Sequence, residues 1–235
     1  MIRNILEKWC KENEISITNE QFSAFEKYAE LLKEWNEKMN LTAIIEDREI
    51  AVKHFIDSMT VLKLVDIKHS SSLIDIGTGA GFPGIPLKIM RPDIKLTLLD
   101  SLNKRLIFLD EVCRCLNIKA EMIHARAEEY SRKPEYREHF DYAVSRAVAN
   151  LPSLCEYCMP YVRLGGEFIS MKGPDGEEEL KSAGNAVKVL GGKVNSVKSM
   201  ELPDSQSRTI IIISKVEHTP SAYPRRGVKI SKQPL

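Results

Sequence analysis

The segment LIDIGTGAGFPGIPL, residues 73–87, joins an apolar run to a glycine-rich turn. Gly77, Gly79 and Gly81 stand at alternate positions, directly after a run that carries Asp75. Glycine lets the backbone approach a ligand closely and adopt positive φ angles. Between a strand and a helix, such a turn lies at the carboxyl end of a parallel sheet, where nucleotides bind. The segment therefore predicts a site for a nucleotide-like cofactor.

Two familiar phosphate-binding spacings do not fit this turn. A P-loop requires Lys-Ser or Lys-Thr after the last glycine, and neither pair follows. The dinucleotide pattern GxGxxG would need a glycine at position 82, where Phe82 would crowd the start of the helix. This weakens the prediction of an NAD-dependent oxidoreductase without excluding it. A cofactor with an adenosine but no phosphate needs no anion cradle, which favours S-adenosylmethionine.

Two further segments could hold the adenosine. Asp100 ends the run LTLLD, nineteen residues after Gly81, where its carboxylate can accept hydrogen bonds from both ribose hydroxyls. In the later segment HARAEEY, Ala127 and Glu128 would lie beside the adenine edge. Glu128 and Glu129 would equally suit an acidic pair at the start of a helix.

The segment SRAVANLP, residues 145–152, is the expected place for the methyl acceptor. The chain lacks both the Asn/Asp-Pro-Pro-aromatic tetrapeptide of exocyclic amine methylation and the Pro-Cys nucleophile of carbon-5 methylation. Guanine N7 has an in-plane lone pair, so it needs only alignment with the methyl group. Arg146 would position a guanine through its acceptor edge, or would form a salt bridge after a strand. Lys172 in SMKGP ends a later strand at the same ligand face.

Other reactive side chains favour structural roles. The motifs CRC (113–115) and CEYC (155–158) lie in expected amphipathic helices, without a turn that would present thiolates to one ion. We therefore expect no metal site. His54 and Asp57, three residues apart on an expected helix, could form a catalytic pair. We favour a role in which they attach an N-terminal helical region to the sheet.

That helical region covers residues 1–70. Apolar residues recur at three- and four-residue steps with charged residues between them, which is typical of amphipathic helices. Thr18 and Gln21 resemble a capping box. The predicted helices cover residues 2–12, 22–39 and 46–64. No strand pattern interrupts them, so we expect a helical cap.

Over residues 71–216, short apolar runs alternate with helical patterns, which indicates a parallel sheet with right-handed crossovers. Two final strand-like runs are separated only by PDSQS, so they should pair antiparallel. We expect an α/β, Rossmann-like fold with a seven-stranded mixed sheet and an antiparallel last strand. The predicted strands cover residues 73–76, 95–99, 120–123, 142–144, 166–171, 193–202 and 208–215. The predicted helices cover residues 86–90, 102–116, 151–162 and 177–190.

Composition narrows the class of protein. With 43% hydrophobic residues, 235 residues can bury a substantial core. No apolar run approaches the roughly 20 residues that cross a bilayer, and the first residues do not resemble a signal peptide. Five cysteines, an odd number, argue against a secreted disulfide framework. We expect a cytoplasmic protein that does not bind membranes.

The net charge of +1 combines 34 basic and 33 acidic residues, so any RNA binding must be local. The last segment, residues 217–235, ends in YPRRGVKISKQPL, with four basic residues and no acid. It is either a basic tail that contacts phosphates or a frayed, solvated terminus. No long exposed apolar stripe demands a partner, so we expect a monomer.

Together these motifs closely resemble the bacterial RsmG (GidB) family, the 16S ribosomal RNA guanine-N7 methyltransferases. The resemblance covers nearly the whole chain, through NLTAI, KHFIDS, DIGTGAGFPGIPL, LLDSLNKR, ARAEE, SRAVANL, MKG and YPR in order. It implies an S-adenosylmethionine-dependent methyltransferase fold. It also implies methyl transfer to N7 of a guanosine in the 530-loop region of 16S rRNA, with naked rRNA or the 30S subunit as substrate.

The resemblance further implies which residues form the site. Those expected to contact S-adenosylmethionine are Gly77, Gly79, Phe82, Asp100, Ser101, Leu102, Ala127, Glu128 and Arg146. Those expected to face RNA or a flipped-out guanine are Arg126, Lys172 and Arg208. Arg146 and Lys172 would position the reactants, and no side chain would act as acid, base or nucleophile. The alternative is a binding protein instead of an enzyme. It would bind RNA or associate with the ribosome and would have a cofactor site without transferase activity.

Overall fold

Seven strands form one mixed sheet in the computed structural model, which describes residues 1–235. Their order across the sheet is β3-β2-β1-β4-β5-β7-β6, and β7 alone runs opposite to the other six. The strands are β1 (Ser72–Ile76), β2 (Lys95–Asp100), β3 (Ala120–His124), β4 (Phe140–Arg146), β5 (Val162–Lys172), β6 (Gly192–Glu201) and β7 (Ser207–Lys215). The predicted seven-stranded mixed sheet with its closing antiparallel pair is therefore confirmed.

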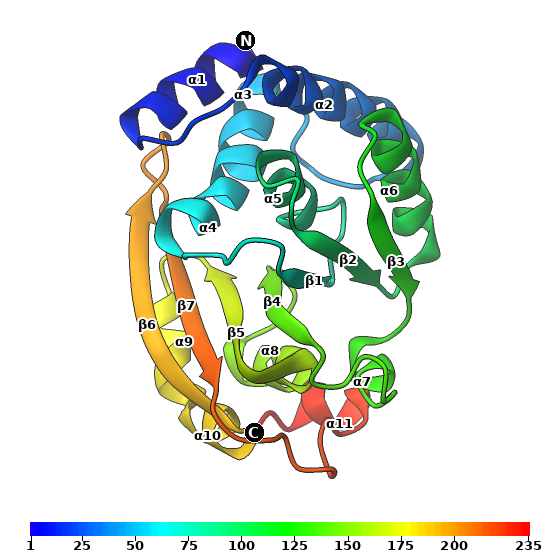
Figure 1. Ribbon diagram of the computed structural model, residues 1–235, viewed down its shortest axis with the longest axis vertical. Coiled ribbons are helices and arrows are strands. Elements are labelled where there is room, and N and C mark those ends of the chain that lie inside the picture. The colour runs from blue at the N-terminus through cyan, green and yellow to red at the C-terminus, as the bar shows by residue number, and fades with distance from the viewer.

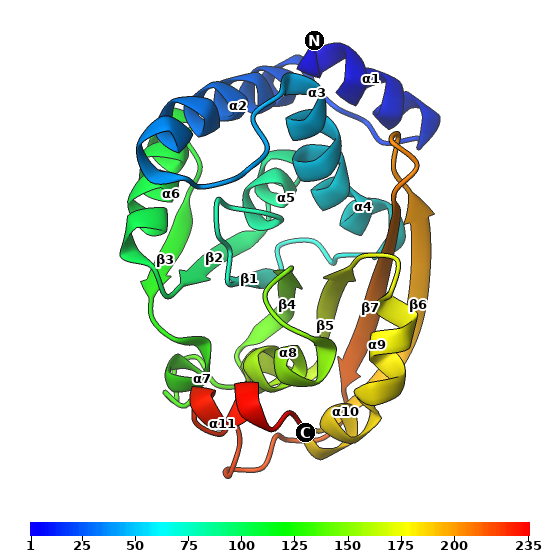
Figure 2. The same cartoon turned by 180° about the vertical axis from the view of Figure 1, so that it is seen from behind.

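Helices cover both faces of this sheet, as Figures 1 and 2 show. One face carries α1 (Ile2–Glu12), α2 (Asn19–Met39), α3 (Asp47–Glu49), α4 (Asp57–Leu64), α5 (Gly84–Met90) and α6 (Asn103–Cys115). The other carries α7 (Ala127–Tyr130), α8 (Leu151–Cys158), α9 (Gly176–Ser182), α10 (Gly184–Val189) and α11 (Gly227–Lys232). Each face has its own apolar core, and the N-terminal helices contribute to the larger one. None of the helices is both long and apolar enough to cross a membrane.

Helix α2 supports the glycine turn from the first face. It begins with the predicted capping box, in which Thr18 Oγ1 accepts from the Gln21 backbone and the Gln21 side chain accepts from the Thr18 backbone. Further along, the fully buried Tyr28 donates a hydrogen bond to the carbonyl of Ala80. The Tyr28 ring also stacks on Phe82, with 5.3 Å between centroids. The amphipathic helix predicted from sequence thus ends up as one wall of the turn.

Residues 46–64 do not form one regular α-helix. Between α3 and α4, residues Ile50–Ile56 form a π-helix, η1, with i→i+5 hydrogen bonds. Such segments are rare and often occur at functional sites. Here the segment and the start of α4 place Lys53, His54 and Asp57 against Arg146 at the end of β4. An apolar repeat of three and four residues could not reveal this local change of helix type.

The prediction of a single helix over residues 177–190 is wrong, because α9 ends at Ser182 and α10 begins at Gly184. Glycine is a poor residue for a helix interior, whereas it is tolerated at a helix start. The break also buries Ala183 in the second core.

The C-terminal segment is docked on the protein, which corrects the prediction of a frayed terminus, whereas contact of its basic residues with phosphates stays a prediction. Arg225 donates hydrogen bonds to the fully buried carboxylate of Glu156 on α8, from its backbone at 2.6 Å and from its guanidinium at 2.6–3.1 Å. Ile230 of α11 is also fully buried. Figure 2 shows α11 lying beside α7 and α8. Only Arg226, Lys229 and Lys232 of its basic residues stay exposed.

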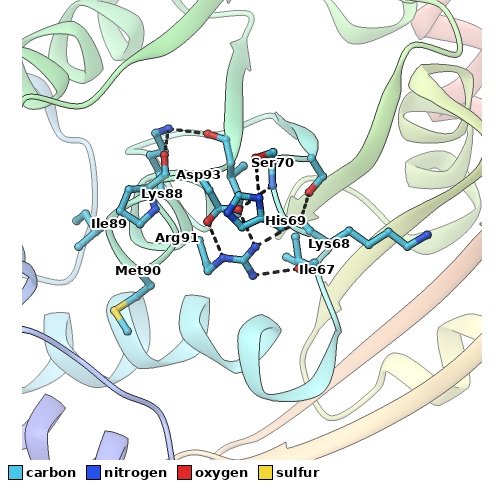
Figure 3. A network of polar contacts seen from close by, with 12 residues as sticks. Ile67, Lys68, His69, Ser70, Lys88, Ile89, Met90, Arg91 and Asp93 are labelled. Carbon is cyan, nitrogen blue, oxygen red and sulfur yellow. Dashed lines mark hydrogen bonds and ion pairs between the residues drawn. The ribbon is translucent and has the colours of Figure 1, made fainter.

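A polar network joins the loops at the amino ends of β1 and β2 (Figure 3). Arg91 donates two hydrogen bonds to Asp93, at 2.7 and 2.8 Å, and one to the carbonyl of Ile67. The backbone of Ser70 donates to the same Asp93 carboxylate at 2.8 Å. The side chain of Gln21 donates to the last carbonyls of α5, so α2 is attached to this network. It lies at the opposite edge from the glycine turn.

We expect Asp93→Asn to lower the free energy of unfolding at pH 7 by about 1 to 3 kcal/mol, because charge-assisted hydrogen bonds are lost. The hydrogen bonds from Arg91 lower the pKa of Asp93. Its contribution is therefore complete above the unfolded pKa of about 4 and is lost as pH falls through the lower folded pKa. Urea unfolding should show a smaller difference from wild type at pH 3 than at pH 7.

The matched control is Asp175→Asn, because Asp175 is exposed at the N-cap of α9 and makes no side-chain capping bond. Asparagine and aspartate are nearly equivalent at that position, so this variant should keep wild-type stability. A difference for Asp93→Asn that does not change between the two pH values would contradict the role of its ionised form.

Candidate functional site

The glycine turn follows β1 and leads into α5. Gly77, Gly79 and Gly81 have φ angles of 70°, 61° and 96°, which side chains rarely tolerate. A Cβ on Gly81 would lie 2.4 Å from the hydroxyl of Tyr28, so packing also requires this glycine. A Cβ on Gly79 would meet no atom closer than 3.9 Å, and one on Gly77 would meet only the Val148 side chain, at 2.5 Å. The space beside Gly79 is therefore open to a ligand, whereas the side chain of Val148 covers Gly77.

Asp75, near the end of β1, has one carboxylate oxygen without a hydrogen-bond partner. Its Oδ2 accepts from Thr78 Oγ1 at 2.7 Å and from the Gly84 backbone at 2.9 Å. Its Oδ1 is buried and has no partner. Burial raises the pKa of Asp75 to about 6. A buried acceptor without a partner fits a ligand that brings a donor, such as the ammonium group of S-adenosylmethionine.

Asp100 at the end of β2 connects two segments of the same edge. Its oxygens accept from the backbone N–H groups of Gly79 and Leu102, both at 2.9 Å, and from Arg105 at 3.1 Å. The Asp100 side chain is only 2% exposed, whereas that of Arg105 is 37% exposed. A ribose can therefore hydrogen bond to this carboxylate only if Arg105 moves aside. The backbone bonds already orient the carboxylate for that contact.

Two apolar side chains are unusually exposed at this edge. Leu102, directly after β2, is 43% exposed, and Val148, which overlies Gly77, is 42% exposed. Ser101 beside Leu102 is exposed as well. Exposed apolar side chains beside a glycine turn fit the faces of an adenine ring or the carbon chain of a ligand.

Glu128, one of the residues expected beside the adenine, lies on α7 next to the C-terminal segment. Ala127 and Glu128 begin α7, and a Cβ on Gly227 would lie 2.1 Å from Glu128 Oε1. Glu128 therefore borders the docked C-terminal segment. Together with Arg126 and Arg226 it lines a separate cavity of about 660 Å³. Arg126 consequently does not share a cavity with the other predicted RNA-facing residues.

Phe82 packs against the helical cap. Its ring is 5% exposed and stacks on His54, with 4.3 Å between centroids and 12° between planes. The guanidinium of Arg146 lies 5.1 Å from the same ring. Its side chain therefore joins the turn to the cap.

A second cavity has a volume of about 810 Å³, and we refer to it as the acceptor cavity. Arg146, Lys172 and Arg208 all line it. They come from three neighbouring strands, since Arg146 on β4 pairs with Met171 on β5 and Lys172 on β5 pairs with Thr209 on β7. Asp57 and Glu179 are the acidic residues in its wall.

Asp57 connects two arginines of the sheet to the cap. Its Oδ2 accepts from Arg146 Nη1 at 2.8 Å and its Oδ1 accepts from Arg208 Nε at 3.0 Å. The Asp57 side chain is only 4% exposed. Arg146 also donates to the carbonyl of Lys53 at 3.0 Å. The expected attachment of the helical region to the sheet is thus present, and it fixes both guanidinium groups.

His54 belongs to the same cluster but is not equipped to donate a proton. Its Nδ1 lies 3.3 Å from Arg146 Nη2, which has only hydrogens to offer, so Nδ1 accepts. Its Nε2–H then donates to Thr42 Oγ1 at 3.1 Å. Burial and the charge of Arg146 lower the pKa of His54 to about 3. The imidazole is therefore neutral at physiological pH and serves as an acceptor for Arg146.

The side chain of Lys172 is buried, and its ammonium group donates hydrogen bonds to other groups of the protein. Its ammonium donates to the carbonyl of Ala149 at 2.6 Å and to Glu179 Oε2 at 2.8 Å. Glu179 Oε2 also accepts from the Leu151 backbone at 2.7 Å. Lys172 thus orders the loop between β4 and α8 before any RNA contact. Glu179 was not expected at this site, because its only signal in the sequence is a run of three glutamates after MKG.

The cysteines do not contribute to either cavity. All five are free thiols, and Cys155 and Cys158 are completely buried within α8. No group of three or more His, Cys, Asp or Glu side chains is placed to hold a metal ion.

Comparison with protein families gives one match. The model of GidB, rRNA small subunit methyltransferase G, matches residues 21–210. The ribosomal RNA small subunit methyltransferase G of Desulforamulus reducens is 53% identical over 234 residues, which cover 98% of this chain and 97% of the relative. That of Clostridium kluyveri is 48% identical over 98% of each chain.

Solved structures resemble the sheet and its helices. A SAM dependent methyltransferase from Aquifex aeolicus has a TM-score of 0.51 and 18% identity, over 67% of this chain and 89% of its own. The ribosomal protein L11 methylase from Lactobacillus delbrueckii subsp. bulgaricus has a TM-score of 0.51 and 13% identity, over 73% of this chain and 80% of its own. At these identities the likeness shows the fold alone, and it confirms the predicted Rossmann-like methyltransferase fold.

Proposed function

Because the chain belongs to the GidB family of small-subunit rRNA methyltransferases, we propose that it methylates N7 of a guanosine in the 530-loop region of 16S rRNA. The observation that carries this proposal is the composition of the acceptor cavity. Fixed guanidinium groups line it, no cysteine does, and its one histidine is neutral and used as an acceptor. Guanine N7 needs alignment with a methyl donor and neither a base nor a covalent intermediate, so such a cavity suffices.

S-adenosylmethionine supplies an electrophilic methyl group in this reaction. Asp75 Oδ1 would accept from its ammonium, and the turn at Gly79 would admit its carbon chain close to the backbone. Asp100 would accept from the ribose hydroxyls after Arg105 has moved. The residues that would surround the adenine are Ser101, Leu102, Ala127 and Glu128.

The substrate is 16S rRNA or the 30S subunit, and the acceptor cavity would receive a flipped-out guanine. Arg146 and Arg208 would donate to the acceptor edge of that base while N7 stays free. Arg126 and Arg226, exposed around the separate cavity, would contact phosphates of the same RNA. We place this monomeric enzyme in the cytoplasm. Its parts would be a helical cap (residues 1–70), a methyltransferase domain (71–216) and a docked C-terminal segment (217–235).

Purified protein should transfer tritium-labelled methyl groups from S-adenosylmethionine to 16S rRNA in 30S subunits that lack the modification, or to the naked RNA. A thermal shift provides the parallel test of binding: S-adenosylmethionine should raise Tm, and NADH should not. Cofactor protection without transfer to either substrate would instead support an inactive binding protein. Protection by NADH alone would support an oxidoreductase.

A further inference from the structure

One carboxylate oxygen of Glu179, in the acceptor cavity, makes no hydrogen bond within the protein. Glu179 Oε2 is held twice, by Lys172 Nζ at 2.8 Å and by the Leu151 backbone at 2.7 Å. Glu179 Oε1 makes no hydrogen bond, although the side chain is only 33% exposed and lines the cavity. An ionised oxygen in this position is an unused acceptor for a ligand.

The other oxygen of the same carboxylate, Oε2, is held by buried partners, which limits the movement of Oε1. Lys172 is itself buried, and its other hydrogen bond goes to the carbonyl of Ala149. Leu151 is the first residue of α8, so its N–H is one of the groups without a partner inside the helix. Charge-assisted bonds of this kind are stronger than neutral ones. Glu179 therefore needs little ordering when a ligand binds, which favours specific recognition.

The cavity presents donors and acceptors from opposite faces of the sheet. Arg146 and Arg208 are held by Asp57 of α4, on the face of the larger core. Glu179 belongs to α9 and is held at the start of α8, on the other face, and Figure 1 shows these two helices there. A base in the cavity would thus meet guanidinium donors on one side and a carboxylate acceptor on the other.

Guanine matches this arrangement. Its O6 and N7 are acceptors, whereas N1–H and the 2-amino group are donors. Enzymes that act on a flipped base read it by hydrogen bonds to the edge that carries those donors. We propose that Glu179 is the residue that selects guanine, with Oε1 accepting from N1–H and the 2-amino group while the arginines donate to O6. This assignment rests on the proposed function and names a specificity determinant for it.

The competing bases would be rejected in a graded way. Adenine has a lone pair at N1 and no 2-amino group, so the carboxylate oxygen would face an acceptor and lose both bonds. Hypoxanthine, the base of inosine, keeps N1–H, O6 and N7 but lacks the 2-amino group. A site built around a hydrogen bond discriminates strongly against a ligand that lacks the donor. A comparison of guanosine with inosine therefore measures the contact between Glu179 and the 2-amino group.

The test uses 30S subunits reconstituted with 16S rRNA that carries guanosine, inosine or adenosine at the methylated position. Wild-type kcat/KM should be about tenfold or more lower for inosine than for guanosine, and lower still for adenosine. In Glu179→Gln the value for guanosine should fall at least tenfold, and the guanosine-to-inosine ratio should fall to about threefold or less. Glu178→Gln is the matched control, because Glu178 is exposed on the same helix and pairs with Lys181.

Glu179→Gln also leaves Lys172 without its charged partner and could disturb folding. A second variant that keeps the charge is therefore needed. Glu179→Asp keeps the charge but withdraws the carboxylate from the cavity, and it should also lower the guanosine-to-inosine ratio. Both variants should bind S-adenosylmethionine with wild-type affinity, measured by calorimetry. Folded variants that retain the wild-type ratio would overturn the assignment and leave Glu179 a purely structural role. Wild-type protein that methylates guanosine in no particle would instead overturn the proposed function.

Discussion

Asp57→Asn is expected to lower kcat/KM for methyl transfer by about a hundredfold or more. Both oxygens of this nearly buried carboxylate accept from arginines, Oδ2 from Arg146 and Oδ1 from Arg208. Asparagine has one acceptor oxygen, and its amide hydrogens would face the other guanidinium. Breaking a buried ion pair in this way costs about 3 to 5 kcal/mol, and a misplacement of about 1 Å can cost a hundredfold in rate.

Steady-state kinetics on 30S subunits, together with urea unfolding, would measure both effects of Asp57→Asn. Asp47→Asn is the matched control, because Asp47 forms an ion pair with Lys33 on the exposed side of the same helical region. Exposed pairs contribute about 0 to 1 kcal/mol, so this variant should keep its activity and nearly all of its stability. A folded Asp57→Asn protein with wild-type kcat/KM would show that the two arginines do not position the substrate.

Asp100→Asn is expected to weaken the binding of S-adenosylmethionine by about a hundredfold. The carboxylate accepts from the backbone of Gly79 and Leu102, one on each oxygen. An amide can serve only one of these donors, so the end of β2 and the glycine turn would separate. The ribose hydroxyls would also lose an ionised acceptor, and hydrogen bonds to charged groups contribute about 1.5 to 3 kcal/mol each.

Isothermal titration calorimetry with S-adenosylmethionine would measure this change in affinity. Asp110→Asn on the exposed side of α6 is the control and should bind with wild-type affinity. Because Arg105 pairs with Asp100 in this structure, Arg105→Gln should bind the cofactor at least as well as wild type. Wild-type affinity in Asp100→Asn would exclude the carboxylate from the ribose contact.

The sheet and its flanking helices could be predicted because they follow local patterns. Apolar runs of three to six residues mark the parallel strands. The segment PDSQS is too short for a crossover helix, so β6 and β7 had to pair antiparallel. The capping box at Thr18 and Gln21 depends on residues three apart and is present as predicted. The glycine turn and Asp100 also meet, because the ends of adjacent parallel strands share one edge.

The polar contacts of the acceptor cavity could not be predicted in the same way. Asp57 lies 89 residues before Arg146 and 151 residues before Arg208 along the chain, and no periodicity connects them. The inward direction of Lys172 depends on Glu179, which the sequence showed only as one of three adjacent glutamates. Such pairings follow from how the layers pack and not from any local sequence signal.

The charge of the C-terminal segment was misleading for a related reason. Its basic composition suggested a solvated or RNA-binding tail, but Arg225 forms an ion pair with Glu156 in the interior of α8. A buried carboxylate requires a partner, and in this fold the tail provides it. The net charge of the segment therefore does not show that one of its arginines pairs with a buried carboxylate.

We propose that the methylated atom is N7 of a guanosine in 16S rRNA. Borohydride and aniline cleave RNA at 7-methylguanosine, and primer extension maps the break. The test uses 30S subunits and naked 16S rRNA incubated with the protein, with and without S-adenosylmethionine. The predicted result is one new stop next to a guanosine of the 530-loop region, present only with protein and cofactor together. Identical cleavage patterns in all samples, with or without methyl incorporation, would contradict the assignment.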